Sequence, residues 1–94
     1  MINRESILKL NEDAIFFDDF PDEAIIGLTS YGQVVYSYSV VKVYMKDYKN
    51  YDDEQAYSEI FIKAFKARYN ENKNTPLILY DDKILAGFDK YFGV

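Results

Sequence analysis

The chain has 94 residues, a net charge of −5 and 49% hydrophobic residues, so we predict one domain over residues 1–94 with its own core. It contains no cysteine and no histidine, which excludes disulfides, thiolate chemistry and imidazole-based catalysis. No apolar run approaches the ~20 residues of a membrane span. The first residues lack a signal-peptide pattern, and we therefore expect a cytoplasmic protein.

Acidic side chains gather near the start of the chain. Residues 1–23 hold seven acidic and two basic residues, so this segment accounts for the whole net charge of −5. Such a surface disfavours direct binding to a nucleic-acid backbone and allows a partner with a basic surface. The alternative is an acidic surface that only keeps the protein dissolved.

The first predicted element is a short helix over residues 4–10. Asn3 can cap its amino end, and Ile2 and Ile7 stand where the two members of a hydrophobic staple belong. The apolar residues 14–17 then stop before Pro21. This piece predicts a loop or an edge strand whose phenylalanines contact the core.

Two strands follow, over residues 24–28 and 34–38. The connection contains Gly32, which can adopt the positive φ that a hairpin loop needs. Tyr36 and Tyr38 would share one face of the second strand, because side chains alternate along a strand. Two arrangements then fit: the tyrosines form a surface patch, or their rings fill a layer between sheet and helices.

The next two elements are helices with apolar residues at helical spacing. Ser37 or Ser39 can cap the first helix, which continues to about Lys49. Asp52 begins a capping-box pattern and starts the second helix, which ends near Tyr69.

A buried strand over residues 77–80 comes last among the well-marked elements, and Asp81 and Asp82 break it. Two structures fit the residues that follow. One is a helix, which the pattern favours although Gly87 weakens it, and the other is a β-hairpin that pairs 77–80 with 84–88. The helical pattern rests on Ile84, Leu85, Phe88, Tyr91 and Phe92.

These elements predict an α+β fold in the order α-β-β-α-α-β, with a possible further helix at the end. We expect a small antiparallel sheet of about three strands with helices packed on one face.

Few residues could carry catalysis. The adjacent carboxylates 18/19, 52/53 and 81/82 could do acid–base work or hold a hard cation. Each pair also has a plainer role as a cap, a breaker or a solvated turn. Ser37 and Ser39 have no ready base, since nothing in the spacing brings Lys42 to them. We therefore expect no enzyme, no cofactor and no metal site.

The remaining signal is a surplus of tyrosine, with ten in the chain. A tyrosine ring favours burial while its hydroxyl needs a partner, so surface tyrosines are common in binding patches. Together with the acidic segment they predict a partner-binding surface made of Asp18, Asp19, Asp22, Glu23, Tyr31, Tyr36 and Tyr38.

Several short motifs follow one another in a characteristic order. They are Asp22-x-Ala24-Ile25-Ile26-Gly27, Val34-Val35-Tyr36-Ser37-Tyr38, Val41 with Met45, Tyr51-x-x-Glu54-x-Ala56-x-x-Glu59 and Thr75-Pro76-Leu77. In this order and spacing they resemble a group of small uncharacterised proteins encoded by bacteriophages and prophages. The likeness covers about residues 20–80, and the segment 62–74 departs from the group because it lacks the usual Asn and Gly-Glu. The resemblance implies a phage or mobile-element origin and the strand-strand-helix-helix-strand order, and it implies no activity.

The leading hypothesis is a non-catalytic protein-binding module. It would be a phage-encoded accessory protein that inhibits or modulates a host protein, such as a defence or nucleic-acid-handling component, without contacting nucleic acid or membrane itself. A self-associating homodimer is the second hypothesis, and a carboxylate-metal enzyme is the third.

Overall fold

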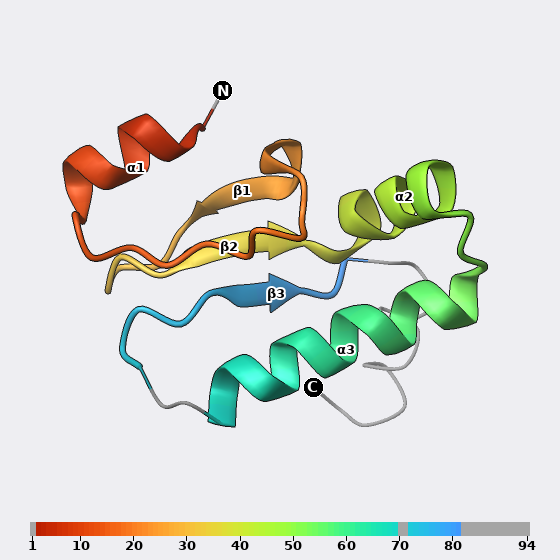
Figure 1. Ribbon diagram of the computed structural model, residues 1–94. Coiled ribbons are helices and arrows are strands. Elements are labelled where there is room, and N and C mark those ends of the chain that lie inside the picture. The colour runs from red at the N-terminus through yellow and green to blue at the C-terminus, as the bar shows by residue number, and fades with distance from the viewer. Residues whose placement is uncertain (1, 70–71, 82–94) are drawn as a thin grey trace.

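The computed structural model describes residues 2–69 and 72–81, and it confirms the α+β class and the predicted order of elements (Figure 1). The helix and the hairpin considered for the residues after Asp82 lie outside the described residues. The elements are α1 (Arg4–Leu10), the short 3₁₀ helix η1 (Asp22–Ala24), β1 (Ile25–Leu28), β2 (Val34–Ser37), α2 (Tyr38–Lys49), α3 (Asp53–Tyr69) and β3 (Leu77–Leu79).

The helices begin at side-chain caps that the sequence predicted. Asn3 and Ser37 each accept a hydrogen bond from the backbone N–H three residues further on, at 2.8 and 3.3 Å. Asp52 and Gln55 form the capping box: each side chain accepts from the backbone N–H of the other, at 2.8 and 3.0 Å. These bonds satisfy backbone donors that have no partner inside the helix.

A hairpin joins β1 to β2, and its loop requires glycine at one position. Gly32 has a φ of 85°, in the region that L side chains rarely adopt. A Cβ at this position would also lie 2.7 Å from Asn11 Nδ2. The same Asn11 amide donates to the Gly32 carbonyl at 3.1 Å and to Asn74 Oδ1 at 3.0 Å, so it ties the hairpin loop to the segment before β3.

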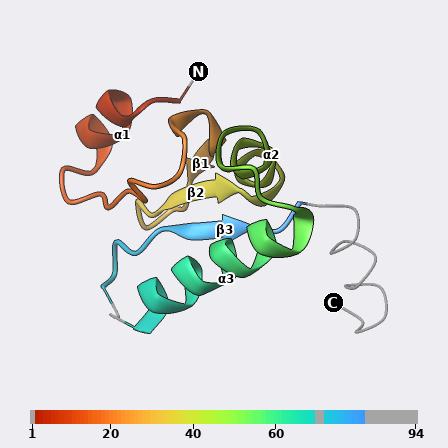
Figure 2. The same cartoon turned by 45° about the vertical axis from the view of Figure 1, so that its right-hand side comes forward.

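The sheet is mixed, so the prediction of an antiparallel sheet is wrong for one of its two strand pairs. The strand order is β1-β2-β3; β1 and β2 are antiparallel, whereas β2 and β3 are parallel. Parallel neighbours need a long crossover, and α2 and α3 together form it. Both ribbon views show α3 returning beside β3, which reverses the chain before the last strand (Figures 1 and 2).

The two faces of the sheet differ in what covers them. Alternation and strand register place five side chains on the core face: Ile25, Leu28, Val34, Tyr36 and Ile78. The opposite face, which we call the open face, carries Val35, Leu77 and Leu79. Leu77 and Leu79 on this face are 37% and 51% exposed, whereas the buried side chains of the described helices belong to the cluster on the core face. The packing is therefore one-sided, as predicted.

The helices and the segment before η1 complete the core over the first face. Phe20 packs there with the helical residues, which are almost fully buried. In the described residues, no helix is both long enough and apolar enough to span a membrane. The helical core residues are Ile7 of α1, Val41 and Met45 of α2, and Ala56 and Ile60 of α3.

Candidate interaction surface

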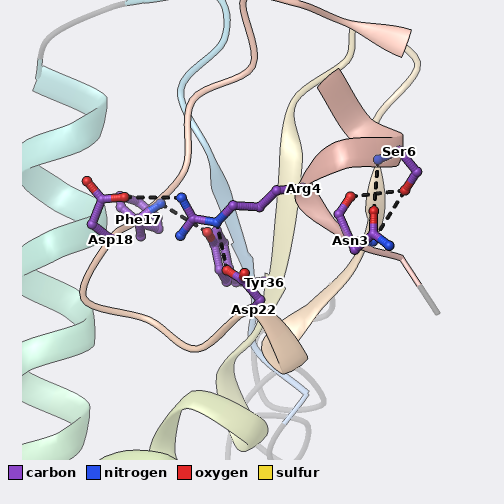
Figure 3. Close-up of polar contacts among 7 residues, drawn as sticks. All are labelled: Asn3, Arg4, Ser6, Phe17, Asp18, Asp22 and Tyr36. Atoms are coloured by element: carbon purple, nitrogen blue, oxygen red, sulfur yellow. Dashed lines mark hydrogen bonds and ion pairs between the residues drawn. The ribbon is translucent and has the colours of Figure 1, made fainter. Parts of the chain in front are cut away.

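Two of the predicted acidic residues bind an arginine of the same chain. The Arg4 guanidinium donates to Asp22 at 2.8 Å and to Asp18 at 3.2 Å, as Figure 3 shows. It also lies 4.7 Å from the centroid of the Phe16 ring, a cation–π distance. The cluster connects the start of α1 to the segment that leads into η1. These two carboxylates therefore have a role inside the fold.

The other two acidic residues differ from each other. Asp19 pairs with Lys63 of α3, whose hydrogen bond and charge lower the pKa of the Asp19 carboxyl. Glu23 makes no ion pair to any residue that the structure describes. Tyr31 is 85% exposed at the tip of the hairpin. Of the predicted surface, Glu23 and Tyr31 are thus the members best placed to meet another molecule.

The prediction that Tyr36 and Tyr38 belong to a binding surface is wrong. Tyr36 is 0% exposed and Tyr38 only 4%. The Tyr36 ring contacts Phe17 and Phe20 at centroid distances of 5.4 Å each, and its hydroxyl accepts a hydrogen bond from the Phe17 N–H at 3.0 Å. Tyr38 begins α2 instead of extending the strand. The rings fill a buried layer because the Tyr36 face of β2 is the core face.

α3 carries a row of partly exposed aromatic side chains that the sequence did not lead us to expect at the surface. The core stripe of this helix is Ala56 and Ile60, whereas a neighbouring stripe at the same i, i+4 spacing is partly exposed. Rings in this stripe stack with centroids 6.1 and 6.4 Å apart, and a T-shaped contact at 6.0 Å joins the stripe to Tyr38. The stripe consists of Tyr57, Phe61 and Phe65.

This aromatic stripe borders a groove between α3 and β3. We call it the α3–β3 groove. Its volume of about 310 Å³ is at the lower end of small-molecule pockets, and more of its lining is apolar than polar. Among the described residues that line the groove, Arg68 is the one with a charged side chain. The lining is Phe61, Ala64, Phe65 and Arg68 from α3, with Pro76, Leu77, Ile78 and Tyr80 from β3 and its flanks.

The groove continues onto the open face of the sheet. Leu77 belongs to both surfaces, because it lines the groove and projects from the open face. Phe61 is 49% exposed at the helix side. An apolar surface that extends over two elements in this way is typical of an interaction site. The sequence could have revealed this surface, because α3 carries two adjacent apolar stripes. A helix that buries one of them in the core leaves the other at least partly exposed.

The best-formed polar site in the described chain joins β3 to α2. Asp81 accepts hydrogen bonds from Ser37 Oγ at 2.6 Å and from the Ser39 N–H at 2.9 Å. Burial alone would raise the pKa of Asp81, but the hydrogen bonds from both serines outweigh it and lower that pKa. A carboxylate held in this charged form caps a helix end.

The described residues contain no group of three or more acidic side chains arranged to hold a metal ion. Comparison with protein-family models, curated proteins and solved structures found no match for this chain.

Proposed function

We propose that this protein is a non-catalytic module that binds another protein through the α3–β3 groove and the adjoining open face. The supporting observation is the contiguous apolar surface formed by Phe61, Leu77 and Leu79 outside the core. Exposed aromatic and leucine side chains gain free energy when a partner removes them from water, by roughly 25 cal/mol per Å². The partner is a protein segment that is apolar and carries a carboxylate, because Arg68 is the charged group of the groove.

The cellular setting is part of the proposal. The resemblance to phage and prophage proteins supports an accessory protein that acts in the host cytoplasm and inhibits or modulates a host protein. Defence and nucleic-acid-handling proteins are the classes we favour. The net charge of −5 argues against direct contact with nucleic acid.

A second candidate surface is the acidic corner near η1. Glu23 and the exposed Tyr31 support it, and its partner would present a basic surface. The ion pairs of Asp18, Asp19 and Asp22 weaken this candidate, because breaking them costs interactions within the chain.

The two surfaces make opposite predictions for matched charge variants. Phe61→Asp should abolish capture of the partner, because burial of an unpaired carboxylate in an apolar interface is unfavourable. Glu23→Lys should leave capture unchanged. The measurement is quantitative mass spectrometry of proteins captured from host lysate, followed by calorimetry with the captured partner.

Tyr48→Asp is the control, since Tyr48 is well exposed on α2 and lies outside the groove. Loss of capture by Glu23→Lys alone would assign binding to the acidic corner. Equal capture by all three variants would reject the proposal, as would turnover of a small molecule by the purified protein.

A further inference from the structure

We propose that a cleft beside α3 binds a small organic anion, which consists of a carboxylate attached to an apolar group. The cleft has a volume of about 390 Å³, within the range of small-molecule pockets, and residues from three distant segments line it: 15–17, 63–67 of α3, and 72–76. We call it the lysine cleft. Among the described lining residues it shares Pro76 alone with the α3–β3 groove, so this inference does not depend on the proposed function.

The lysine cleft has a cationic lining made by α3. Lys63 and Lys66 are three residues apart, so their side chains leave neighbouring positions on the helix surface. Lys63 binds Asp19, whereas Lys66 makes no ion pair to any residue that the structure describes. Glu59 precedes Lys63 by one turn and does not line the cleft. Two ammonium groups thus face one bound carboxylate, and an anion can pair with the uncompensated charge of Lys66.

The polar lining also includes an amide whose orientation is fixed. Asn72 Oδ1 accepts a hydrogen bond from the Asn74 N–H at 2.8 Å, which leaves the Asn72 Nδ2 group to donate to a ligand. The Thr75 N–H donates to the Asn72 carbonyl at 3.0 Å, and the Thr75 carbonyl accepts from Gln33 Nε2 at 3.1 Å. These bonds hold the 72–75 turn in place before a ligand arrives, which lowers the entropic cost of binding.

The rest of the lining is apolar. Its side chains are Ile15, Phe17, Ala67 and Pro76. The Phe17 ring packs against the buried Tyr36 ring at a centroid distance of 5.4 Å, and Pro76 is itself buried. A hydrated inorganic ion would leave these side chains in contact with water, whereas an apolar group on the anion would remove them from it. The cleft therefore favours an anion that carries an aromatic ring or a short alkyl chain.

An NMR titration of the full chain tests the site with phenylacetate, a carboxylate that carries one ring. At constant pH, the backbone amide signals of Lys66, Ala67 and Asn72 should shift and saturate. Phenylacetamide has the same shape without the charge, and inorganic phosphate lacks the ring, so each should bind about tenfold more weakly. Absence of saturation with phenylacetate, or equally tight binding of either control, would overturn the proposal.

Carboxylates of this kind occur in free small molecules and at the carboxyl end of a peptide. N-acetylphenylalanine reproduces the end of a peptide chain and distinguishes these two sources. Tighter binding than that of phenylacetate would indicate a peptide terminus, and weaker binding would indicate a free small molecule.

Matched charge variants show whether the anion binds in the cleft. Lys66→Gln should weaken phenylacetate binding about tenfold, because it removes a charge-assisted hydrogen bond. Lys9→Gln removes the same charge from the last turn of α1 and should leave the affinity unchanged. Both lysines are exposed, so neither change should disturb the fold, and urea unfolding checks this. Equal weakening by the two variants would mean long-range attraction alone and would reject the site.

Phe61→Asp separates this site from the proposed function. Phe61 lines the α3–β3 groove and not the lysine cleft, so this variant should bind phenylacetate as tightly as the unaltered chain. Loss of phenylacetate binding would place the anion in the groove beside Arg68 and contradict the inference. Partner capture and anion binding therefore succeed or fail independently.

Discussion

At the scale of single residues, the sequence pattern does not tell whether a given tyrosine is buried or exposed. Tyr36 and Tyr31 were both predicted to belong to one binding surface. The Tyr36 ring is buried in the core, whereas Tyr31 is exposed at the tip of the hairpin. The difference comes from position: Tyr36 lies on the core face of β2, where the Phe17 N–H donates to its hydroxyl, whereas Tyr31 lies in the hairpin loop. A buried tyrosine with a satisfied hydroxyl contributes its ring to the core at little polar cost.

Tyr36→Phe tests this assignment. The change removes the acceptor and leaves the Phe17 N–H without its partner, so we expect a loss of about 1 kcal/mol in the free energy of unfolding. The matched change Tyr31→Phe should have no measurable effect, because its hydroxyl faces water. Urea unfolding followed by circular dichroism measures both, and equal stability of the two variants would contradict the assignment.

At the scale of elements, side-chain bonds at the ends of helices and strands decide how the pieces join. α2 follows β2 without a loop, and Ser37 is both the last residue of the strand and the cap of the helix. Asp81 then binds this junction from β3. From the sequence, Asp81 is expected at a turn or in a carboxylate pair with Asp82, and its role at this junction is not foreseen because Ser37 and Ser39 lie far away along the chain.

Asp81→Ala should lower the free energy of unfolding at pH 7 by about 1 kcal/mol, the usual worth of a cap at an accessible site. The folded protein lowers the pKa of Asp81 below its ordinary 3.8, so this contribution is complete above pH 3.8. It should disappear as the pH falls through the folded-state pKa. Urea midpoints of both proteins between pH 7 and pH 2 measure this, and a difference that grows in acid would contradict it.

At the scale of the whole molecule, one shared core stabilises elements that would not be stable in isolation. α1 has seven residues, too few for a stable isolated helix. It is held by Ile7 in the core and by Arg4 on the segment before η1. The sheet has three short strands, and the crossover helices α2 and α3 bury their apolar residues in the same core.

This shared core predicts that α1 unfolds together with the sheet. Ile7→Ala should lower the free energy of unfolding of the entire domain by about 2–5 kcal/mol, because it leaves a cavity in the core. Leu8→Ala is the control, since Leu8 is largely exposed on the same helix. Hydrogen exchange should show faster exchange in β2 and α3 as well as in α1. Faster exchange confined to α1 would mean that the helix is an independent attachment.

The sequence by itself determined the local structure. Caps at Asn3 and Asp52, the glycine at position 32 and the helical spacing of apolar residues act over a few residues, so they can be recognised without knowing the fold. The tertiary structure decided the parallel partner of β2, the burial of Tyr36 and Tyr38, and the exposure of the α3 aromatic stripe. Those outcomes depend on which distant segments meet, since the same apolar side chain is core or surface according to what packs against it.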